Sequence, residues 1–285
     1  MTIERVLVVG AGLMGHGIAH ALAAAGMRVD LLEPELGRAV LGRDRIAASL
    51  ARAVEKGRLT PDDRDAILGR VVAVDDVGAA RAADLVVEAV PEDADLKRTV
   101  LAAIDAHAPE RAVIATNTSS IGIGGLAAVL APRRRPRFIG MHFFSPVPVM
   151  PLVEVVRGSA TSAETVAAVE ALAADLGKRT IASADRPGFI VNRILMPLLV
   201  ESMRALEDGT GSAADIDAGA RLGLDHPMGP LELADFIGLD VCLGILRVLE
   251  DGLGDRFAPP AILTGLVSAG HLGRKTGRGF HAYEH

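Results

Sequence analysis

The sequence predicts an α/β fold, with a mostly parallel sheet covered by helices and followed by an all-helical region. Two observations support this. Short β-branched apolar runs alternate with helical patterns up to about residue 182, which is typical of a parallel sheet. After the polar segment Ser183–Gly188 the strand patterns almost vanish, and helical segments separated by Gly and Pro follow. We therefore expect two domains, at residues 1–186 and 187–285.

The chain begins with a strand, a glycine turn, a helix, a second strand and an acidic residue, in that order. This arrangement is the fingerprint of a Rossmann-type, dinucleotide-binding domain. An acid at the end of the second strand strengthens it, since G-x-G-x-x-G alone is a weak motif. The parts are Ile3–Val9, the turn Gly10-Ala11-Gly12-Leu13-Met14-Gly15, an apolar helical pattern, and Val29–Leu32 ending on Glu33.

Each glycine of the turn has a physical task. Gly10 permits the tight turn, Gly12 leaves room for a pyrophosphate, and Gly15 lets the helix pack closely on the sheet. The helix N-terminus offers N–H groups and partial positive charge to the phosphates. We therefore expect cofactor contacts from these glycines and from Leu13 and Met14.

Glu33 determines the kind of dinucleotide. Its carboxylate can accept hydrogen bonds from both hydroxyls of the adenine ribose and would repel a 2′-phosphate, so we predict NAD rather than NADP. Arg38 follows closely in the sequence and leaves NADP as an alternative cofactor.

Composition narrows the partners and the compartment. A net charge of −6 argues against nucleic acid as the main partner, and no apolar run approaches the ~18 residues of a membrane span. The first strand begins within the first few residues, which leaves no room for a signal peptide. Cys242 is the only cysteine, which fits a reducing cytoplasm.

Polar residues follow two predicted strands where those strands end. Ala112–Thr116 leads into Asn117-Thr118-Ser119-Ser120, and Phe138–Met141 delivers His142. Open α/β sheets bind ligands at this edge. Among the eight histidines, His142 alone follows a sheet strand, which makes it a candidate base.

Glu154 lies inside the apolar run Leu152–Val156. A buried carboxylate is costly unless it is paired, and an imidazole partner would meet that cost. The alternative is an edge strand with Glu154 facing water. His16 and His20 have the spacing of a metal pair but lack a third ligand nearby, so we predict no metal site.

The helical pattern Pro34–Lys56 is rich in arginine. One interpretation is an ordinary solvated face. The other is an electrostatic site for the phosphates of a large anionic substrate, with Arg52 and Lys56 at the helix end.

These motifs together resemble the L-3-hydroxyacyl-CoA dehydrogenases, and most closely the stand-alone bacterial 3-hydroxybutyryl-CoA dehydrogenases. The resemblance runs from Val6 to about Tyr283, nearly the whole chain. The motifs that carry it are Gly10–Gly15; Val87–Glu92 with Lys97; Thr116–Ser120; His142–Phe144 and Leu152–Val155; Pro187–Arg193; Pro227–Pro230; and Leu272–Phe280.

The resemblance implies a reaction and a set of roles. The reaction is reversible, NAD-dependent oxidation of a short-chain (S)-3-hydroxyacyl-CoA to the 3-oxoacyl-CoA, in fatty acid metabolism, by a homodimer joined through the helical C-terminal domain. The implied roles are His142 as base with Glu154 as its partner, Ser119 and Asn192 around the substrate oxygen, Glu92, Lys97 and Asn117 beside the cofactor, and Arg52 and Lys56 on the CoA nucleotide.

Ser145, Pro151 and His281 depart from the family pattern and put the acyl preference in doubt. Three alternatives remain: a hydroxyacyl group held by an acyl carrier protein, a sugar acid oxidised by the same chemistry, and a non-catalytic NAD-binding module.

Overall fold

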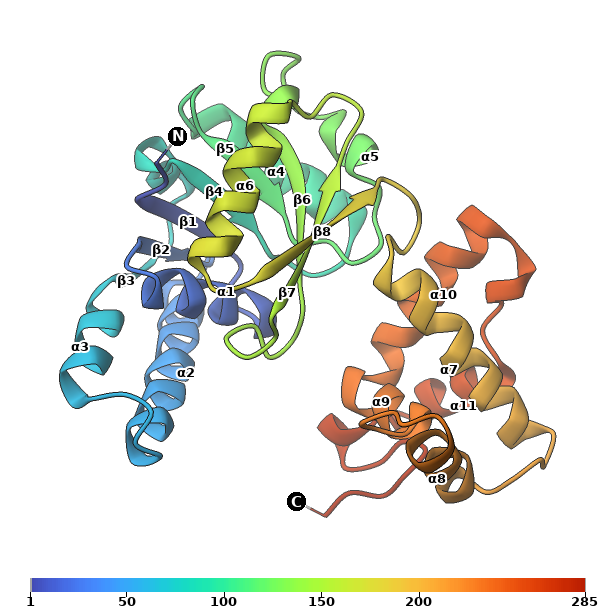
Figure 1. Cartoon of the computed structure of the whole chain (residues 1–285). Coiled ribbons are helices and arrows are strands. Elements are labelled where there is room, and N and C mark those ends of the chain that lie inside the picture. The colour runs from blue at the N-terminus through green and yellow to red at the C-terminus, as the bar shows by residue number, and fades with distance from the viewer. Residues whose placement is uncertain (1, 285) are drawn as a thin grey trace. The chain divides into compact units, whose positions relative to one another are not determined.

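The structure is a computed structural model that describes residues 2–284, so the outermost residues of the two expected domains, Met1 and His285, lie outside it. The chain divides into two compact units, residues 1–186 and 187–285, and each is described by itself (Figure 1).

The first unit is built on one eight-stranded sheet with the order β3-β2-β1-β4-β5-β6-β7-β8. In the described residues six neighbouring pairs are parallel, and only β6 and β7 are antiparallel. The prediction of a mostly parallel sheet is confirmed. The strands are β1 (Arg5–Val9), β2 (Arg28–Leu32), β3 (Val71–Val74), β4 (Leu85–Glu88), β5 (Val113–Thr116), β6 (Phe138–Phe143), β7 (Leu152–Arg157) and β8 (Arg179–Ala184).

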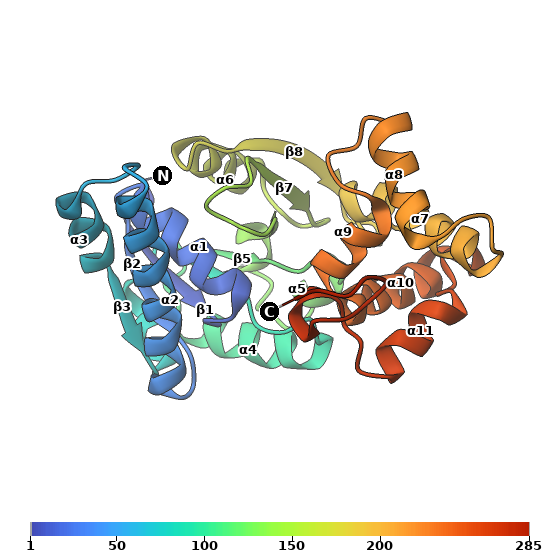
Figure 2. The same ribbon diagram turned by 90° about the horizontal axis from the view of Figure 1, so that it is seen from below.

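Helices cover both faces of this sheet. Figures 1 and 2 show α4 on one face and α6 on the other, with β2 and β3 at one end of the sheet and β7 and β8 at the opposite end. Apolar side chains of α1, α2 and α6 pack with the sheet in one core. The helices are α1 (Leu13–Ala24), α2 (Leu36–Glu55), α3 (Pro61–Gly69), α4 (Ala94–His107), α5 (Ile123–Ala127) and α6 (Ala163–Asp175), with short 3₁₀ turns at Val77–Ala82 and Arg135–Arg137.

Local chemistry explains several helix ends. Thr60 and Asp63 form a capping box at the start of α3, where the N–H of Asp63 donates to Oγ1 of Thr60 (3.1 Å) and the N–H of Thr60 donates to Oδ2 of Asp63 (3.2 Å). The side chain of each residue thus supplies a hydrogen-bond acceptor for the backbone N–H of the other. Asp93 caps α4 in a similar way, accepting from the N–H groups of Asp95 and Leu96.

Four strands are longer than the sequence predicts: β2 and β7 by one residue each, and β6 and β8 by more. β6 was expected to end at Met141, but the antiparallel ladder carries it on to Phe143, with His142 opposite Glu154. His142 therefore lies inside the strand rather than after it, because pairing with β7 and not local propensity sets the end. β8 runs to Ala184, beyond the last strand pattern of the sequence near residue 182, because it pairs along the whole of β7.

The second unit is helical, as predicted, and has its own apolar core. Its described part also contains two isolated β-bridges and short 3₁₀ turns at Asp255–Phe257 and Arg274–Thr276. Over residues 2–284, no helix combines the length and the apolar character that crossing a membrane requires. The helices are α7 (Val191–Glu207), α8 (Ala213–Gly223), α9 (Pro230–Ile237), α10 (Leu239–Leu253) and α11 (Ala261–Ser268).

Two buried carboxylates hold the segment after α11 against α8 and α9. Asp235 accepts hydrogen bonds from the N–H groups of Phe280 and His281 and from the hydroxyl of Tyr283, each at 2.9 Å. Nε2 of His281 lies 2.7 Å from Oδ2 of Asp217. His281, which departs from the family pattern, is thus paired with Asp217 in this unit.

Candidate active site

The three glycines of the turn after β1 differ in backbone conformation and in the space around them. Gly10 has a φ of +101°, a conformation that L side chains rarely adopt. A Cβ on Gly15 would lie 1.7 Å from the carbonyl oxygen of Gly10, whereas no described atom lies within 4 Å of a Cβ built on Gly12. Leu13 is exposed and Met14 is half-buried at the start of α1. The turn is therefore closed at Gly15 and open at Gly12.

Glu33 follows β2 directly and is tied to this turn. The backbone N–H of Ala11 donates to Oε1 of Glu33 at 2.7 Å. The acid thus braces the glycine turn, a task that the sequence does not reveal because the two residues are 22 positions apart. Arg38 is exposed near the start of α2.

His142 and Glu154 form a buried pair across β6 and β7. Nδ1 of His142 lies 2.6 Å from Oε2 of Glu154. Glu154 has 0% exposure, and β7 lies between β6 and β8. The alternative of an edge strand with Glu154 facing water is therefore wrong. The ring of Phe144 packs against the imidazole with centroids 4.5 Å apart.

The polar residues after β5 lie beside the end of β6. Oδ1 of Asn117 accepts a hydrogen bond from the backbone N–H of Phe143 at 2.9 Å. This bond links the segment that carries Ser119 to the strand that carries His142. Ser119 is half-buried, and its backbone N–H donates to Glu92.

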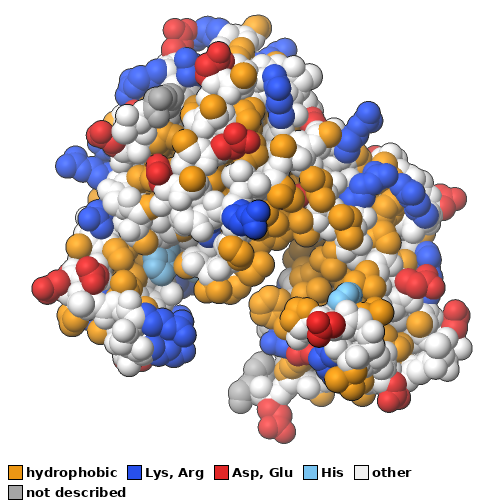
Figure 3. Space-filling view, viewed as in Figure 1, with side chains coloured by type: hydrophobic (Ala, Val, Ile, Leu, Met, Phe, Trp, Pro, Cys, Tyr) orange, Lys and Arg blue, Asp and Glu red, His pale blue; other side chains and the backbone are white. Residues whose placement is uncertain are grey.

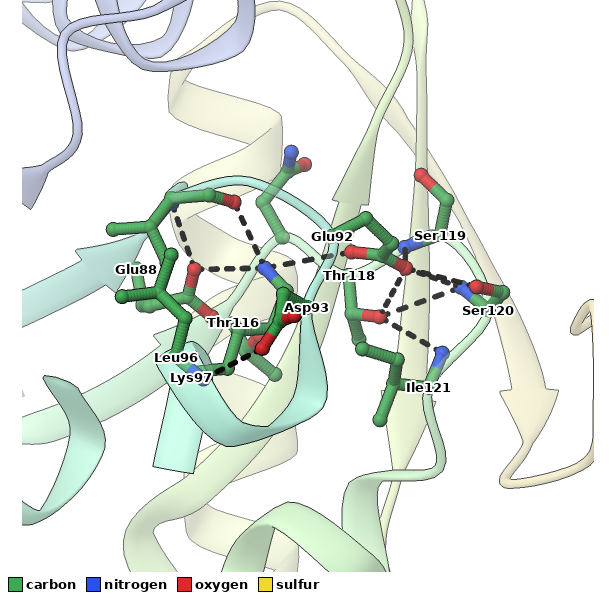
Figure 4. Close-up of polar contacts among 12 residues, drawn as sticks. Glu88, Glu92, Asp93, Leu96, Lys97, Thr116, Thr118, Ser119, Ser120 and Ile121 are labelled. Atoms are coloured by element: carbon green, nitrogen blue, oxygen red, sulfur yellow. Dashed lines mark hydrogen bonds and ion pairs between the residues drawn. The ribbon is translucent and has the colours of Figure 1, made fainter. Parts of the chain in front are cut away.

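Glu92 and Lys97 belong to a cluster of charges that also includes Glu88 (Figure 4). Nζ of Lys97 lies 2.8 Å from Oε1 of Glu88 and 3.4 Å from Oε2 of Glu92. Burial alone would raise the pKa of the Glu92 carboxyl. The ammonium of Lys97 and hydrogen bonds from the segment around Ser119 outweigh burial, so the pKa lies below its usual value. Sequence reasoning missed Glu88, which looks like an ordinary strand residue.

The other predicted site residues lie in α7 and at the end of α2. Asn192 is buried near the start of α7, in the second unit. Arg52 is in the last turn of α2, Lys56 caps that helix, and both are exposed. Figure 3 shows Lys and Arg side chains gathered near the lower end of α2. Within the described residues no group of three or more His, Cys, Asp or Glu side chains could hold a metal ion.

Comparisons with known proteins cover nearly the entire chain. Two family profiles match: "3-hydroxyacyl-CoA dehydrogenase, NAD binding domain" over residues 5–186 and "3-hydroxyacyl-CoA dehydrogenase, C-terminal domain" over residues 188–283. A probable 3-hydroxybutyryl-CoA dehydrogenase of Bacillus subtilis is 44% identical over 285 residues, which is 100% of this chain and 99% of that protein.

Two solved structures are similar over their full lengths. The crystal structure of FadB2 of M. tuberculosis superimposes with a TM-score of 0.96 at 42% identity, covering 100% of both chains. The crystal structure of (S)-3-hydroxybutyryl-CoA dehydrogenase PaaH1 of Ralstonia eutropha gives a TM-score of 0.94 at 45% identity, also covering 100% of both chains.

Proposed function

The chain belongs to the 3-hydroxyacyl-CoA dehydrogenase family, and on that premise we propose that it oxidises a short-chain (S)-3-hydroxyacyl-CoA, typified by 3-hydroxybutyryl-CoA, to the 3-oxoacyl-CoA. It is an NAD-dependent oxidoreductase, in line with its NAD-binding profile. The observation that carries the proposal is the buried His142–Glu154 pair, 2.6 Å apart, in the same unit as the dinucleotide turn.

The glycine turn fits NAD. The space in front of Gly12 would be filled by any side chain there, and Gly12 is the N-cap of α1, whose first turn has no capping side chain. Its first N–H groups are then available to phosphate oxygens. Glu33 would hold the adenine ribose, and Glu92, Lys97 and Asn117 would flank the nicotinamide end. NAD, when bound, supplies the hydride acceptor.

His142 would act as the base that takes the hydroxyl proton. Because Nδ1 faces Glu154, the proton-accepting nitrogen of the neutral ring is Nε2. As the imidazole becomes positively charged, the buried carboxylate of Glu154 stabilises the new charge. Ser119 and Asn192 would hold the substrate oxygen at reaction distance, a contribution of orientation rather than of proton transfer.

Arg52 and Lys56 would hold the phosphates of CoA. Both lie exposed at the end of α2, where positive charge attracts an anionic substrate and where added salt screens the attraction. The KM for an acyl-CoA should therefore rise with salt, and Arg52→Ala together with Lys56→Ala should flatten that dependence.

The decisive test is the oxidation of NADH with acetoacetyl-CoA. His142→Ala should lower kcat by at least about 100-fold, the scale of general-base loss, while the Kd for NADH stays within about twofold. Near-normal turnover in the variant would overturn the assignment of His142. Absence of turnover in the wild type would overturn the proposed function.

The same exposed basic residues on α2 favour a second candidate, a substrate carried by an acidic acyl carrier protein. Comparing kcat/KM for acetoacetyl-CoA with that for the acetoacetyl group on such a carrier decides between the two.

We further propose a homodimer joined through the helical unit, working in the cytoplasm in fatty acid metabolism. Large apolar side chains exposed on that unit support the dimer, and the single buried cysteine fits a reducing compartment. Light scattering should give twice the chain mass of 29.6 kDa. Charged substitutions of the exposed apolar residues should shift the measured mass toward that of one chain. These residues are Ile194, Leu222, Leu224, Phe236 and Val241.

A further inference from the structure

Glu92 is the centre of the polar cluster shown in Figure 4. Its Oε1 accepts four hydrogen bonds: from the hydroxyl of Thr118 (2.7 Å), from the backbone N–H groups of Ser119 (2.8 Å) and Ser120 (2.9 Å), and from the hydroxyl of Ser120 (3.0 Å). A single carboxylate oxygen thus holds three consecutive residues of the segment after β5. Charge-assisted bonds of this kind are stronger than neutral ones.

Thr118 reinforces the same turn from inside. Its hydroxyl oxygen accepts from the backbone N–H groups of Ser120 (3.3 Å) and Ile121 (2.9 Å) while its O–H donates to Glu92. The backbone of Ser119 lies between these contacts, so its position depends on where the Glu92 carboxylate is held.

The other oxygen of Glu92 faces Lys97, and Lys97 is committed to protein atoms. An ammonium has three N–H donors, and three oxygens surround this one: Oε1 of Glu88 (2.8 Å), the carbonyl of Val90 (3.2 Å) and Oε2 of Glu92 (3.4 Å). The Lys97 side chain is only 1% exposed. A ligand outside the protein therefore meets Glu92, which keeps 35% of its side chain exposed, before it meets Lys97.

Glu88 anchors this arrangement in the sheet. It is the last residue of β4 and is fully buried. Besides Lys97, it accepts from the hydroxyl of Thr116 at 2.6 Å and from the backbone N–H of Val90 at 2.8 Å. The carboxyl ends of β4 and β5 are thereby joined through side chains as well as through the sheet.

We propose that Glu88, Lys97 and Glu92 form a positioning latch that holds the Ser119 turn, residues 118–121, in the geometry needed for turnover. The inference rests on the proposed function, in which Ser119 holds the substrate oxygen. The three residues are positioning residues: Glu88 fixes Lys97, Lys97 fixes Glu92, and Glu92 fixes the backbone of Ser119. The latch explains why a lysine with a 1% exposed side chain lies at this edge of the sheet.

The test uses Glu92, because removal of Lys97 would leave the buried carboxylate of Glu88 without its charge partner and could unfold the protein. Glu92→Ala removes the carboxylate that accepts four hydrogen bonds from the turn but leaves Lys97 paired with Glu88. Glu92→Gln keeps one carbonyl oxygen for the turn and loses the attraction to Lys97. Glu110→Gln is the matched control, because Glu110 forms an exposed ion pair with Arg133 at 2.7 Å, outside the latch.

Two measurements follow for each variant: hydrogen exchange of the amides at residues 118–121, and kcat and KM for acetoacetyl-CoA at saturating NADH. Glu92→Ala should raise the exchange of the Ser119 and Ser120 amides by about tenfold or more, the scale of a lost hydrogen bond. It should lower kcat by about 100-fold, the scale of a misplaced substrate contact. Glu92→Gln should recover most of both losses, and Glu110→Gln should change neither.

Amide exchange measured without NADH separates this role from the contact with the cofactor. Because Glu92 also flanks the nicotinamide end, Glu92→Ala should weaken NADH binding as well, and kcat is therefore measured at saturating NADH. A weaker Kd for NADH with unchanged amide exchange would overturn the latch and leave Glu92 as a cofactor contact alone. Because exchange needs no substrate, the latch is tested even if the wild type fails to reduce acetoacetyl-CoA, an outcome that would overturn only the proposed function.

Discussion

Alanine substitutions at Gly12 and Gly15 separate cofactor access from packing in the same turn. At Gly15 the added Cβ would lie 1.7 Å from the carbonyl oxygen of Gly10, far inside van der Waals contact, so the backbone must move. Overpacking of this kind costs about 1–3 kcal/mol. At Gly12 φ is −65° and no described atom lies within 4 Å of the new Cβ. There alanine reduces the conformational entropy of the unfolded chain, which stabilises the folded protein by about 0.4–1 kcal/mol. This gain roughly offsets the stability lost because alanine is a weaker helix N-cap than glycine.

The assay combines thermal unfolding with titration of NADH fluorescence, which is simplified because the chain has no Trp. Gly12→Ala should unfold near the wild-type temperature and bind NADH at least tenfold more weakly, a loss of about 1.4 kcal/mol. Gly15→Ala should lose both stability and affinity. Gly219→Ala, on the exposed face of α8 with no described atom near its Cβ, should keep wild-type affinity. Wild-type affinity in Gly12→Ala would show that the pyrophosphate does not approach this backbone.

Four further predictions follow from single contacts. Glu33→Ala should weaken NADH binding about tenfold and reduce the preference for NADH over NADPH in titrations; unchanged NADH affinity would remove Glu33 from the ribose site. Glu154→Gln should lower kcat at least about 100-fold while crystal structures keep the His142 ring in place, and wild-type kcat would contradict the pairing argument. Burial raises the pKa of the Cys242 thiol to about 12, so a disulfide reagent at neutral pH should titrate no thiol in the native chain and one after unfolding. Because the pKa of Glu92 is lowered on folding, its ionised form stabilises the protein above the ordinary carboxyl pKa, and the excess stability of wild type over Glu92→Gln in denaturant titrations should vanish as pH falls through the lowered pKa.

Local patterns made much of the first unit predictable. The turn Gly10–Gly15 and the acid Glu33 are read from about thirty consecutive residues. In such segments, residues close together in the sequence determine the conformation of the backbone.

Contacts between distant segments were not predictable in the same way. Glu88 reads as the end of a strand, and only the fold brings Lys97 and Thr116 to its two oxygens. Asp235, which binds the C-terminal segment 45 or more residues away, has no motif of its own. A charged residue inside an apolar run indicates that a partner exists, but its identity depends on tertiary contacts.

The reversal between β6 and β7 shows how topology places a functional group. Had β7 run parallel to β6, its last residues would reach the edge where β6 ends, and Glu154, the third residue of β7, would lie toward the other edge. The antiparallel pairing instead sets Glu154 directly opposite His142, near the carboxyl end of β6, on the same face of the sheet. A slip of one residue would turn Glu154 to the opposite face and leave a buried carboxylate without its imidazole, at a cost of several kcal/mol. The pair therefore favours its own register, so the contact proposed for proton transfer also helps to specify the strand pairing that creates it.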